Sequence, residues 1–151
     1  MDNKGLVGKD GDTVKLLREC DAGVKMGISS IEDVIDDVKS DELKNLLSDS
    51  REQHKKLEIE LESLLDNHND DGKEPNPMAK SMSWIKTNMK MMTDPSDQTI
   101  ADLMTDGCNM GVKSLNKYLN KYPSADNSSK RITGRLVEIE SKLSNDLSQF
   151  L

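Results

Sequence analysis

Apolar side chains recur at alternating steps of three and four residues in four separate stretches, and this period limits the possible folds more than any other feature of the chain. The four stretches cover residues 14–38, 43–64, 99–122 and 132–150. Asp21 and His54 are polar occupants of the first and second series. The fourth series passes through Leu136, Ile139 and Leu143. Each stretch predicts one amphipathic helix, and together they predict an all-α four-helix bundle.

The connections between the stretches predict how the helices are arranged. Only a few residues separate the first stretch from the second, and the third from the fourth, and such short links make neighbouring helices antiparallel. Residues 66–98 form a much longer crossover, in which residues 78–93 lie between Pro77 and Pro95 and predict a short fifth helix. Its apolar stripe consists of Met78, Met82, Ile85, Met89 and Met92. This short, long, short order is the connectivity of a ferritin-like bundle, in which one crossover joins two antiparallel hairpins.

A short internal repeat supports this arrangement. Residues 20–25 read Cys-Asp-Ala-Gly-Val-Lys, and residues 108–113, which begin 88 positions later, read Cys-Asn-Met-Gly-Val-Lys. We therefore expect one hairpin to be present twice, with the crossover inserted between the copies. Residues 1–12 are polar and rich in glycine, which predicts a flexible leader, and residues 13–151 then form a single domain.

The charge of the chain excludes several classes of partner. The net charge is −7, whereas binding to nucleic acid phosphates or to an anionic membrane surface needs a basic face. No apolar run approaches the roughly 20 residues of a membrane span, and the first residues show no signal-peptide pattern. Only two cysteines occur, so no disulfide framework is expected. These features predict a cytoplasmic protein that binds itself or another protein.

The two Cys-x-x-Gly segments of the repeat, together with Trp84 in the crossover, carry a resemblance to a known family. By these features the chain resembles a bacterial family of ferritin-like proteins of unknown function, and the resemblance covers roughly residues 13–147. In that family a glutamate follows each of the two glycines, whereas this chain has Val24 and Val112. The resemblance implies that a carboxylate at these positions points into the bundle and could bind a metal. A valine cannot.

A carboxylate-bridged di-metal centre in a bundle needs a Glu from two helices and a Glu-x-x-His motif from each of the other two. Arg51, not an acid, stands three residues before His54, and the last helix has no histidine. Asp21 and His54 are predicted on the apolar faces of adjoining helices, about 7 Å apart along the bundle axis at 1.5 Å per residue. Glu58 lies one turn from His54. These three residues are the candidates for a remnant metal site. The alternative, which we favour, is a hydrogen-bonded polar pair in the core.

Two other kinds of chemistry are open to residues of this chain. A histidine phosphotransfer domain also has a histidine in the middle of a helix, but that histidine is exposed and followed by a lysine and a small residue. Here Lys55, Lys56, Leu57 and Glu58 follow His54 without a glycine, and the place of His54 among the apolar positions of its helix predicts burial. Cys20 and Cys108 stand at equivalent positions of the repeat and could approach one another. Redox chemistry would need an exposed thiol of lowered pKa, and we expect buried thiols that pack as small apolar groups.

The sequence therefore predicts a ferritin-like bundle without a catalytic residue, a cofactor or a working metal centre, which self-associates or binds a partner. The methionine stripe of residues 78–92 offers a surface for covering the flank of the bundle or for a second copy of the chain. The second hypothesis is a metal-binding or oxidative-stress protein of the ferritin-like group. The third is a histidine phosphotransfer domain.

Overall fold

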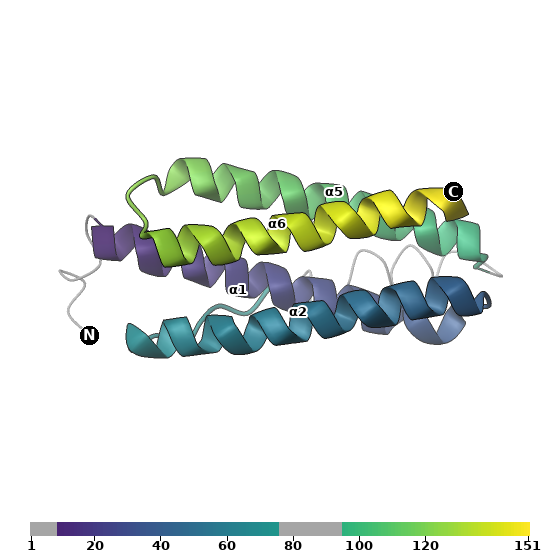
Figure 1. The fold of residues 1–151 in the computed structure, drawn as a ribbon, viewed down its shortest axis with the longest axis horizontal. Helices are drawn as coiled ribbons and strands as arrows, with labels where there is room; N and C mark the ends of the chain where they lie inside the picture. The colour runs from purple at the N-terminus through teal and green to yellow at the C-terminus, as the bar shows by residue number, and fades with distance from the viewer. Residues whose placement is uncertain (1–8, 76–94) are drawn as a thin grey trace.

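A computed structural model describes residues 9–75 and 95–151 (Figure 1). Its elements are α1 (Lys9–Val34), the short 3-10 helix η2 (Ile35–Asp37), α2 (Asp41–Asn67), α5 (Asp97–Lys121), α6 (Asn127–Leu147) and η3 (Ser148–Phe150). Throughout these two ranges the chain is helical or irregular and forms no strand, which confirms the all-α four-helix bundle. Helix α1 begins at Lys9, four residues before the start predicted for the domain. The helix predicted at residues 78–93 lies outside the described residues.

Local hydrogen bonds explain where three of the helices begin. Ser40, Ser96 and Asp126 precede α2, α5 and α6, and each side chain accepts a hydrogen bond from the backbone N–H three residues further on, at 2.8 to 3.2 Å. A side-chain oxygen at this position satisfies an N–H group that has no partner within the helix. These polar caps fix the first residue of α2, α5 and α6, which the spacing of apolar residues alone does not determine.

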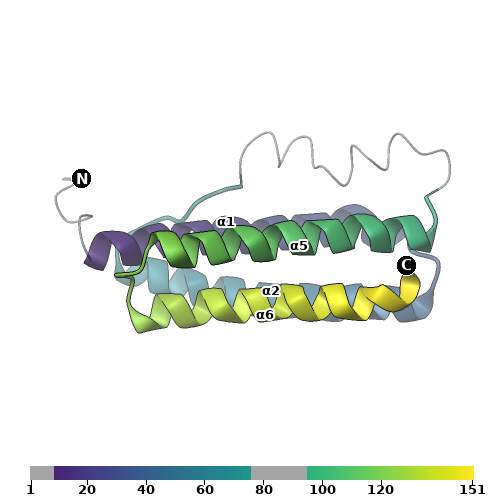
Figure 2. The same ribbon diagram turned by 90° about the horizontal axis from the view of Figure 1, so that it is seen from above.

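The four helices form two hairpins that pack side by side. Helix α1 pairs with α2 and α5 pairs with α6, while α1 also lies beside α5 and α2 beside α6 (Figures 1 and 2). The Asp97 carboxylate accepts hydrogen bonds at 2.8 Å from the backbone N–H groups of Lys39 and Ser40, which joins the start of α5 to the α1–α2 turn. At the other end, the N–H of Asp126 donates to the Thr13 hydroxyl at 2.8 Å. Neighbouring helices are therefore antiparallel, and α2 ends at the opposite end of the bundle from the start of α5.

The first residues of the crossover turn back along α1. Gly72 has a φ of +86°, and a Cβ at this position would lie 2.3 Å from Asp21 Oδ2. Because glycine has no Cβ, the backbone can pass this close, and the N–H of Lys73 donates to the same Asp21 oxygen at 3.0 Å. The Lys73 ammonium also binds Glu19 at 2.5 Å. Residues 70–75, which we call the strap, are thus tied to α1 by buried and half-buried polar contacts.

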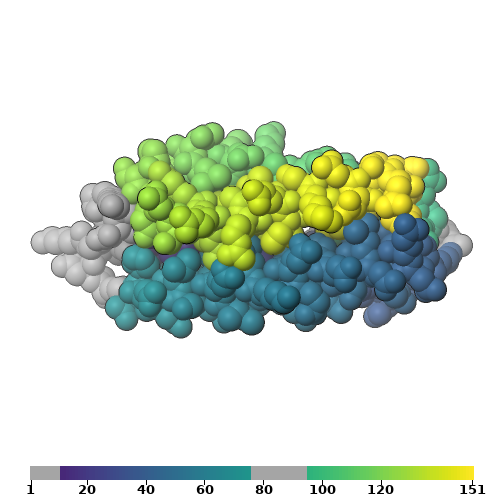
Figure 3. Space-filling model, in the orientation of Figure 1, coloured from purple at the N-terminus to yellow at the C-terminus, as the bar shows by residue number. Residues whose placement is uncertain are grey.

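The opposite face of the bundle is formed by α2 and α6, whose side chains meet along its length in Figure 3. The exposed Arg135 guanidinium of α6 binds both carboxylate oxygens of Glu60 on α2, which links the two hairpins across this face. None of the helices in the described part of the chain is long and apolar enough to span a bilayer.

The apolar core is divided into two clusters. One cluster lies toward the α1–α2 turn and includes Ile31, Leu47, Met104 and Leu143. The other lies toward the α5–α6 turn and includes Leu17, Val24, Leu57, Leu61, Leu115 and Leu136. Between the clusters lie four residues, one on each helix, that are not large hydrophobes and that approach one another: Gly27 on α1, His54 on α2, Gly111 on α5 and Glu140 on α6. We call these four residues the polar layer.

Candidate functional site

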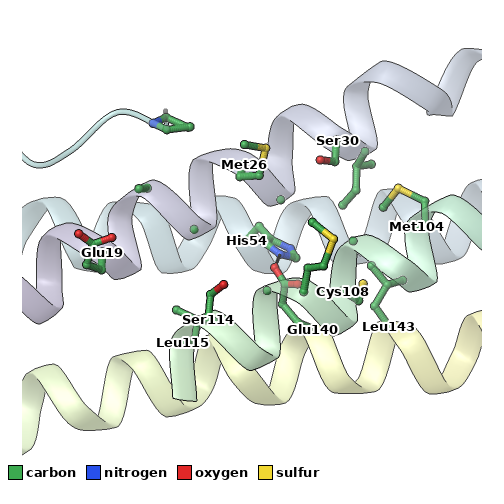
Figure 4. A pocket seen from close by; sticks show the side chains of 18 of the residues that line it. Glu19, Met26, Ser30, His54, Met104, Cys108, Ser114, Leu115, Glu140 and Leu143 are labelled. Atoms are coloured by element: carbon green, nitrogen blue, oxygen red, sulfur yellow. Dashed lines mark hydrogen bonds and ion pairs between the residues drawn. The ribbon is translucent and has the colours of Figure 1, made fainter. Parts of the chain in front are cut away.

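The polar layer holds a histidine and a glutamate that face one another inside the bundle. The side chains of His54 and Glu140 point toward each other from α2 and α6, and His54 Nε2 lies 3.4 Å from Glu140 Oε1 (Figure 4). On its other side, His54 Nδ1 lies 2.7 Å from the backbone oxygen of Ser50. Only 1% of His54 and 7% of Glu140 is exposed. The His54 ring is therefore held in position by the Ser50 carbonyl, and both polar groups are buried in the core.

The hydrogen bond to Ser50 determines which nitrogen of His54 carries a proton. A backbone carbonyl oxygen can only accept a hydrogen bond, so the proton of a neutral imidazole lies on Nδ1 and Nε2 is left with a lone pair. The contact between Nε2 and Glu140 is then a hydrogen bond only when one of these two groups has gained a further proton. Without it, two hydrogen-bond acceptors face one another at this point of the bundle.

Two glycines provide the space that this pair occupies. A Cβ at Gly27 would lie 2.6 Å from His54 Nε2, and a Cβ at Gly111 would lie 2.6 Å from Glu140 Oε2. Both distances are too short for any other residue unless the histidine or the glutamate moves. The glycines therefore let α1 and α5 pass directly over the two polar side chains.

A pocket of about 690 Å³ lies between α1 and α5 and reaches this pair. Most of its lining is apolar, with Met26 and Ile31 from α1, Met104 and Leu115 from α5, and Leu143 from α6. His54, Glu140 and Cys108 also line it, and the strap contributes Lys73, Glu74 and Pro75. The pocket thus combines an apolar wall with one buried polar point, and its strap side carries the charged groups Glu19, Lys73 and Glu74.

Both thiols are buried, as the sequence predicted. Burial raises the pKa of the Cys20 thiol to about 12, against a weaker opposing effect of a hydrogen bond with Thr133. Burial also raises the pKa of Cys108, and the nearby Glu140 carboxylate raises it further. Cys20 and Cys108 pack in different apolar clusters. Although Cys108 borders the pocket, its thiol is a poor nucleophile at neutral pH because the thiolate is the reactive form.

The residues proposed for a remnant metal site have different partners in the structure. Asp21 is buried and binds the Lys25 ammonium at 2.9 Å as well as the strap, whereas His54 binds Ser50 and Glu140. Glu58 is half-buried, and burial together with the neighbouring acids raises its pKa. Within residues 9–75 and 95–151, no three His, Cys, Asp or Glu side chains come together as a group that could hold a metal ion.

Glu140 is the site residue that the sequence did not reveal. The step of seven residues from Leu136 to Leu143 can be divided at Ile139 or at Glu140, and hydrophobicity favoured Ile139. In the structure Glu140 is buried and Ile139 is half-buried, so the seam passes through the acid. In the same way, Gly27 and not Ile28 faces the polar layer. The predicted burial of His54 on the neighbouring helix was the one feature of the sequence that indicated the need for a polar partner.

The burial of His54 also bears on the phosphotransfer hypothesis. A response-regulator domain must reach the imidazole of such a histidine directly, and here the side chain is 1% exposed and covered by the bundle. A small molecule in the pocket can reach it, but a folded domain cannot. We therefore discard the phosphotransfer hypothesis.

The fold and the polar layer define an all-helical bundle of two hairpins with a pocket between α1 and α5. The chain belongs to the family described as a domain of unknown function (DUF2383), whose profile matches residues 12–121. This agrees with the predicted membership of a helical family of unknown function. His54, Gly27 and Gly111 lie within the matched residues, and Glu140 lies beyond them.

The fold is also found in a known crystal structure. The chain is similar to a conserved hypothetical protein from Mycobacterium tuberculosis, with a TM-score of 0.70 and 11% sequence identity, over 95% of this chain and 99% of that chain. At this identity the similarity shows a shared fold and nothing further. No curated protein matches the chain.

Proposed function

We propose that this protein is a non-catalytic binding protein whose pocket between α1 and α5 takes up a small, largely apolar molecule. The observation that carries the proposal is the pocket of about 690 Å³ that opens onto the His54–Glu140 pair. Small-molecule sites typically measure about 300 to 1,000 Å³ and combine an apolar lining with a few convergent polar groups. Met26, Met104 and Leu115 supply such a lining, and flexible methionine side chains adapt to ligands of different shape.

The proposal treats the chain as a ferritin-like bundle in which ligand binding stands in place of metal chemistry. Its two hairpins, long connection and antiparallel neighbours support the ferritin-like relation. Val24 packs in the core at a position where the family resemblance implies a carboxylate. The cytoplasm is the proposed location, because the net charge is −7 and both thiols are unpaired.

Association with a protein partner or a second copy of the chain is the second candidate. Met110 lines the pocket and is 55% exposed, and Ile59 on α2 is 68% exposed. Exposed apolar side chains of this kind can contribute to an interface when they join a larger patch. Sedimentation of the wild type against Met82→Glu tests this candidate, because a charge in the predicted methionine stripe should shift an oligomer toward monomer. Met82 lies outside the described residues.

Titration calorimetry with octanol tests the binding proposal on the full-length protein. We expect saturable binding to the wild type, and we expect Ser114→Phe to weaken it about tenfold or more, since Ser114 lines the pocket and a phenyl ring there would occupy ligand space. Asn116→Phe is the matched control, because Asn116 is exposed on the same helix and does not line the pocket. Equal binding to both variants, or no binding of octanol or any other eight-carbon probe to the wild type, overturns the proposal.

A further inference from the structure

We infer that the pocket selects its ligand by an ammonium group, so that a primary alkyl amine in its cationic form is the favoured class. This inference rests on the proposed function, because it assumes that the pocket binds small molecules. It follows from the hydrogen-bonding state of the polar layer. His54 Nδ1 is committed to the Ser50 carbonyl, and so Nε2 of the neutral ring offers a lone pair beside the Glu140 carboxylate.

Glu140 offers further unused hydrogen-bonding capacity. Its Oε1 faces His54 at 3.4 Å, whereas its Oε2 has no hydrogen-bond partner among the described residues and lies beside Gly111. The Glu140 side chain is nine-tenths buried and lines the pocket, so a group inside the pocket can reach this oxygen. When the ring is neutral and the carboxylate is ionised, these two acceptors lie side by side, and a donor on a bound molecule can satisfy both.

An ammonium group fits these two acceptors better than the other common head groups do. It carries three N–H donors and a positive charge, and a hydrogen bond between charged partners is stronger than one between neutral groups. A hydroxyl group brings a single donor and no charge. A ligand carboxylate would bring a second negative charge against Glu140, which is unfavourable in a site of low dielectric.

The charges around Glu140 also favour a cationic ligand. The thiols of Cys20 on α1 and Cys108 on α5 lie near the Glu140 carboxylate, and burial keeps both neutral by raising the pKa of each, with a further rise from Glu140. On the strap side, Lys73 is the nearby cation, and its ammonium binds Glu19. The whole chain carries a net charge of −7, which attracts cations toward the pocket.

The alkyl part of the ligand would lie along the apolar wall. The walls on either side of the polar layer are formed by Met26 and Ile31 on α1 and by Met104 and Leu115 on α5. A chain whose ammonium group is held at Glu140 therefore has apolar contacts available for its whole length. Each buried methylene favours transfer out of water, so the head group sets selectivity while the alkyl chain supplies affinity.

The test compares probes that share one alkyl chain and differ in the head group. Octylamine, octanol, octanoate and octyltrimethylammonium are titrated into the full-length wild type at neutral pH. We expect octylamine to bind about tenfold or more tightly than octanol, and octanoate to bind most weakly. Octyltrimethylammonium carries the charge without an N–H donor, so we expect it to bind more weakly than octylamine. This ranking does not depend on the folding of any variant.

Two variants then assign the selectivity to Glu140. Glu140→Gln keeps the size of the side chain and removes its charge, so octylamine should bind about tenfold more weakly while octanol changes less than about twofold. Glu138→Gln is the matched control on the same helix, where the side chain is exposed, and it should leave both affinities unchanged.

The outcomes separate this inference from the proposed function. If octylamine, octanol and octanoate bind the wild type equally, the ammonium inference is wrong and the proposed function stands. If none of the probes binds, the proposed function itself fails. A wild-type preference for octylamine that survives Glu140→Gln would overturn the assignment to this carboxylate.

Discussion

Gly27→Ala should destabilise the bundle, although alanine is favoured over glycine within a helix by roughly 1 kcal/mol. The new Cβ would lie 2.6 Å from His54 Nε2 and 2.7 Å from its Cδ2, with Glu140 Oε1 at 3.3 Å. The imidazole cannot easily retreat, because it is buried and its Nδ1 is bound to the Ser50 carbonyl at 2.7 Å. Overpacking a core costs about 1 to 3 kcal/mol, and a ring held this firmly favours the upper value. After the gain in helix propensity, we expect a net loss of about 2 kcal/mol.

Urea denaturation measures this loss against a matched substitution. Gly134 lies within α6, and a Cβ there would meet nothing within 4 Å, so Gly134→Ala should stabilise the protein by up to about 1 kcal/mol. The same glycine-to-alanine change should thus have opposite signs at the two positions. Combining Gly27→Ala with His54→Ala removes the clash, and the penalty of the alanine should then disappear. Equal stabilisation at both glycines, or an unchanged penalty in the His54→Ala background, would refute the proposed role of Gly27.

Three further predictions concern other parts of the molecule. Asp21→Ala should lower the free energy of unfolding by roughly 2 to 3 kcal/mol in urea denaturation, because it removes a buried carboxylate that binds a backbone N–H of the strap. Amide exchange in the strap should become faster, and unchanged exchange would contradict this. Cys20 and Cys108 should resist an aromatic disulfide reagent in mildly alkaline buffer and react at once in urea, because burial raises the pKa of both thiols; rapid labelling of the folded protein would count against their burial. Arg135→Ala should cost less than about 1 kcal/mol at neutral pH. The hydrogen bond from Arg135 lowers the pKa of Glu60 in the folded protein. The loss in free energy of unfolding should therefore be complete above the ordinary pKa of 4.5 and vanish as the pH falls through the lowered pKa. A loss that persists in acid would exclude this pair as its cause.

The sequence was sufficient to predict the helices because their pattern has a physical cause. A buried stripe needs apolar side chains at helical spacing, and short links force hairpins, so the four helices and their pairing follow from periodicity and length. The burial of His54 followed from its place on a seam, and the structure confirms it. The short extension of α1 to Lys9 was missed because the polar residues before Thr13 carry no apolar signal.

The partners of the buried polar residues could not be predicted in the same way. Which side chains meet across a bundle depends on the rotation of each helix about its axis, and a step of seven residues leaves that rotation open by one position, as at Ile139 and Glu140. The prediction that paired Asp21 with His54 used only their places on the apolar faces of adjoining helices and their similar depth. In the structure it binds the backbone of a segment that reaches it through Gly72, and the path of an irregular segment has no periodic signature.

The internal repeat has a consequence for how a ligand would lie in the pocket. The two cysteines of the repeat are both buried on corresponding helices, but the polar layer is not repeated. The residue 88 positions after His54 is Lys142, the residue 88 positions before Glu140 is Glu52, and both are exposed. The imidazole is therefore supplied only by the first hairpin and the carboxylate only by the second. Although the two hairpins share a sequence repeat, a guest in the pocket would therefore meet an imidazole from α2 and a carboxylate from α6, which are chemically different groups.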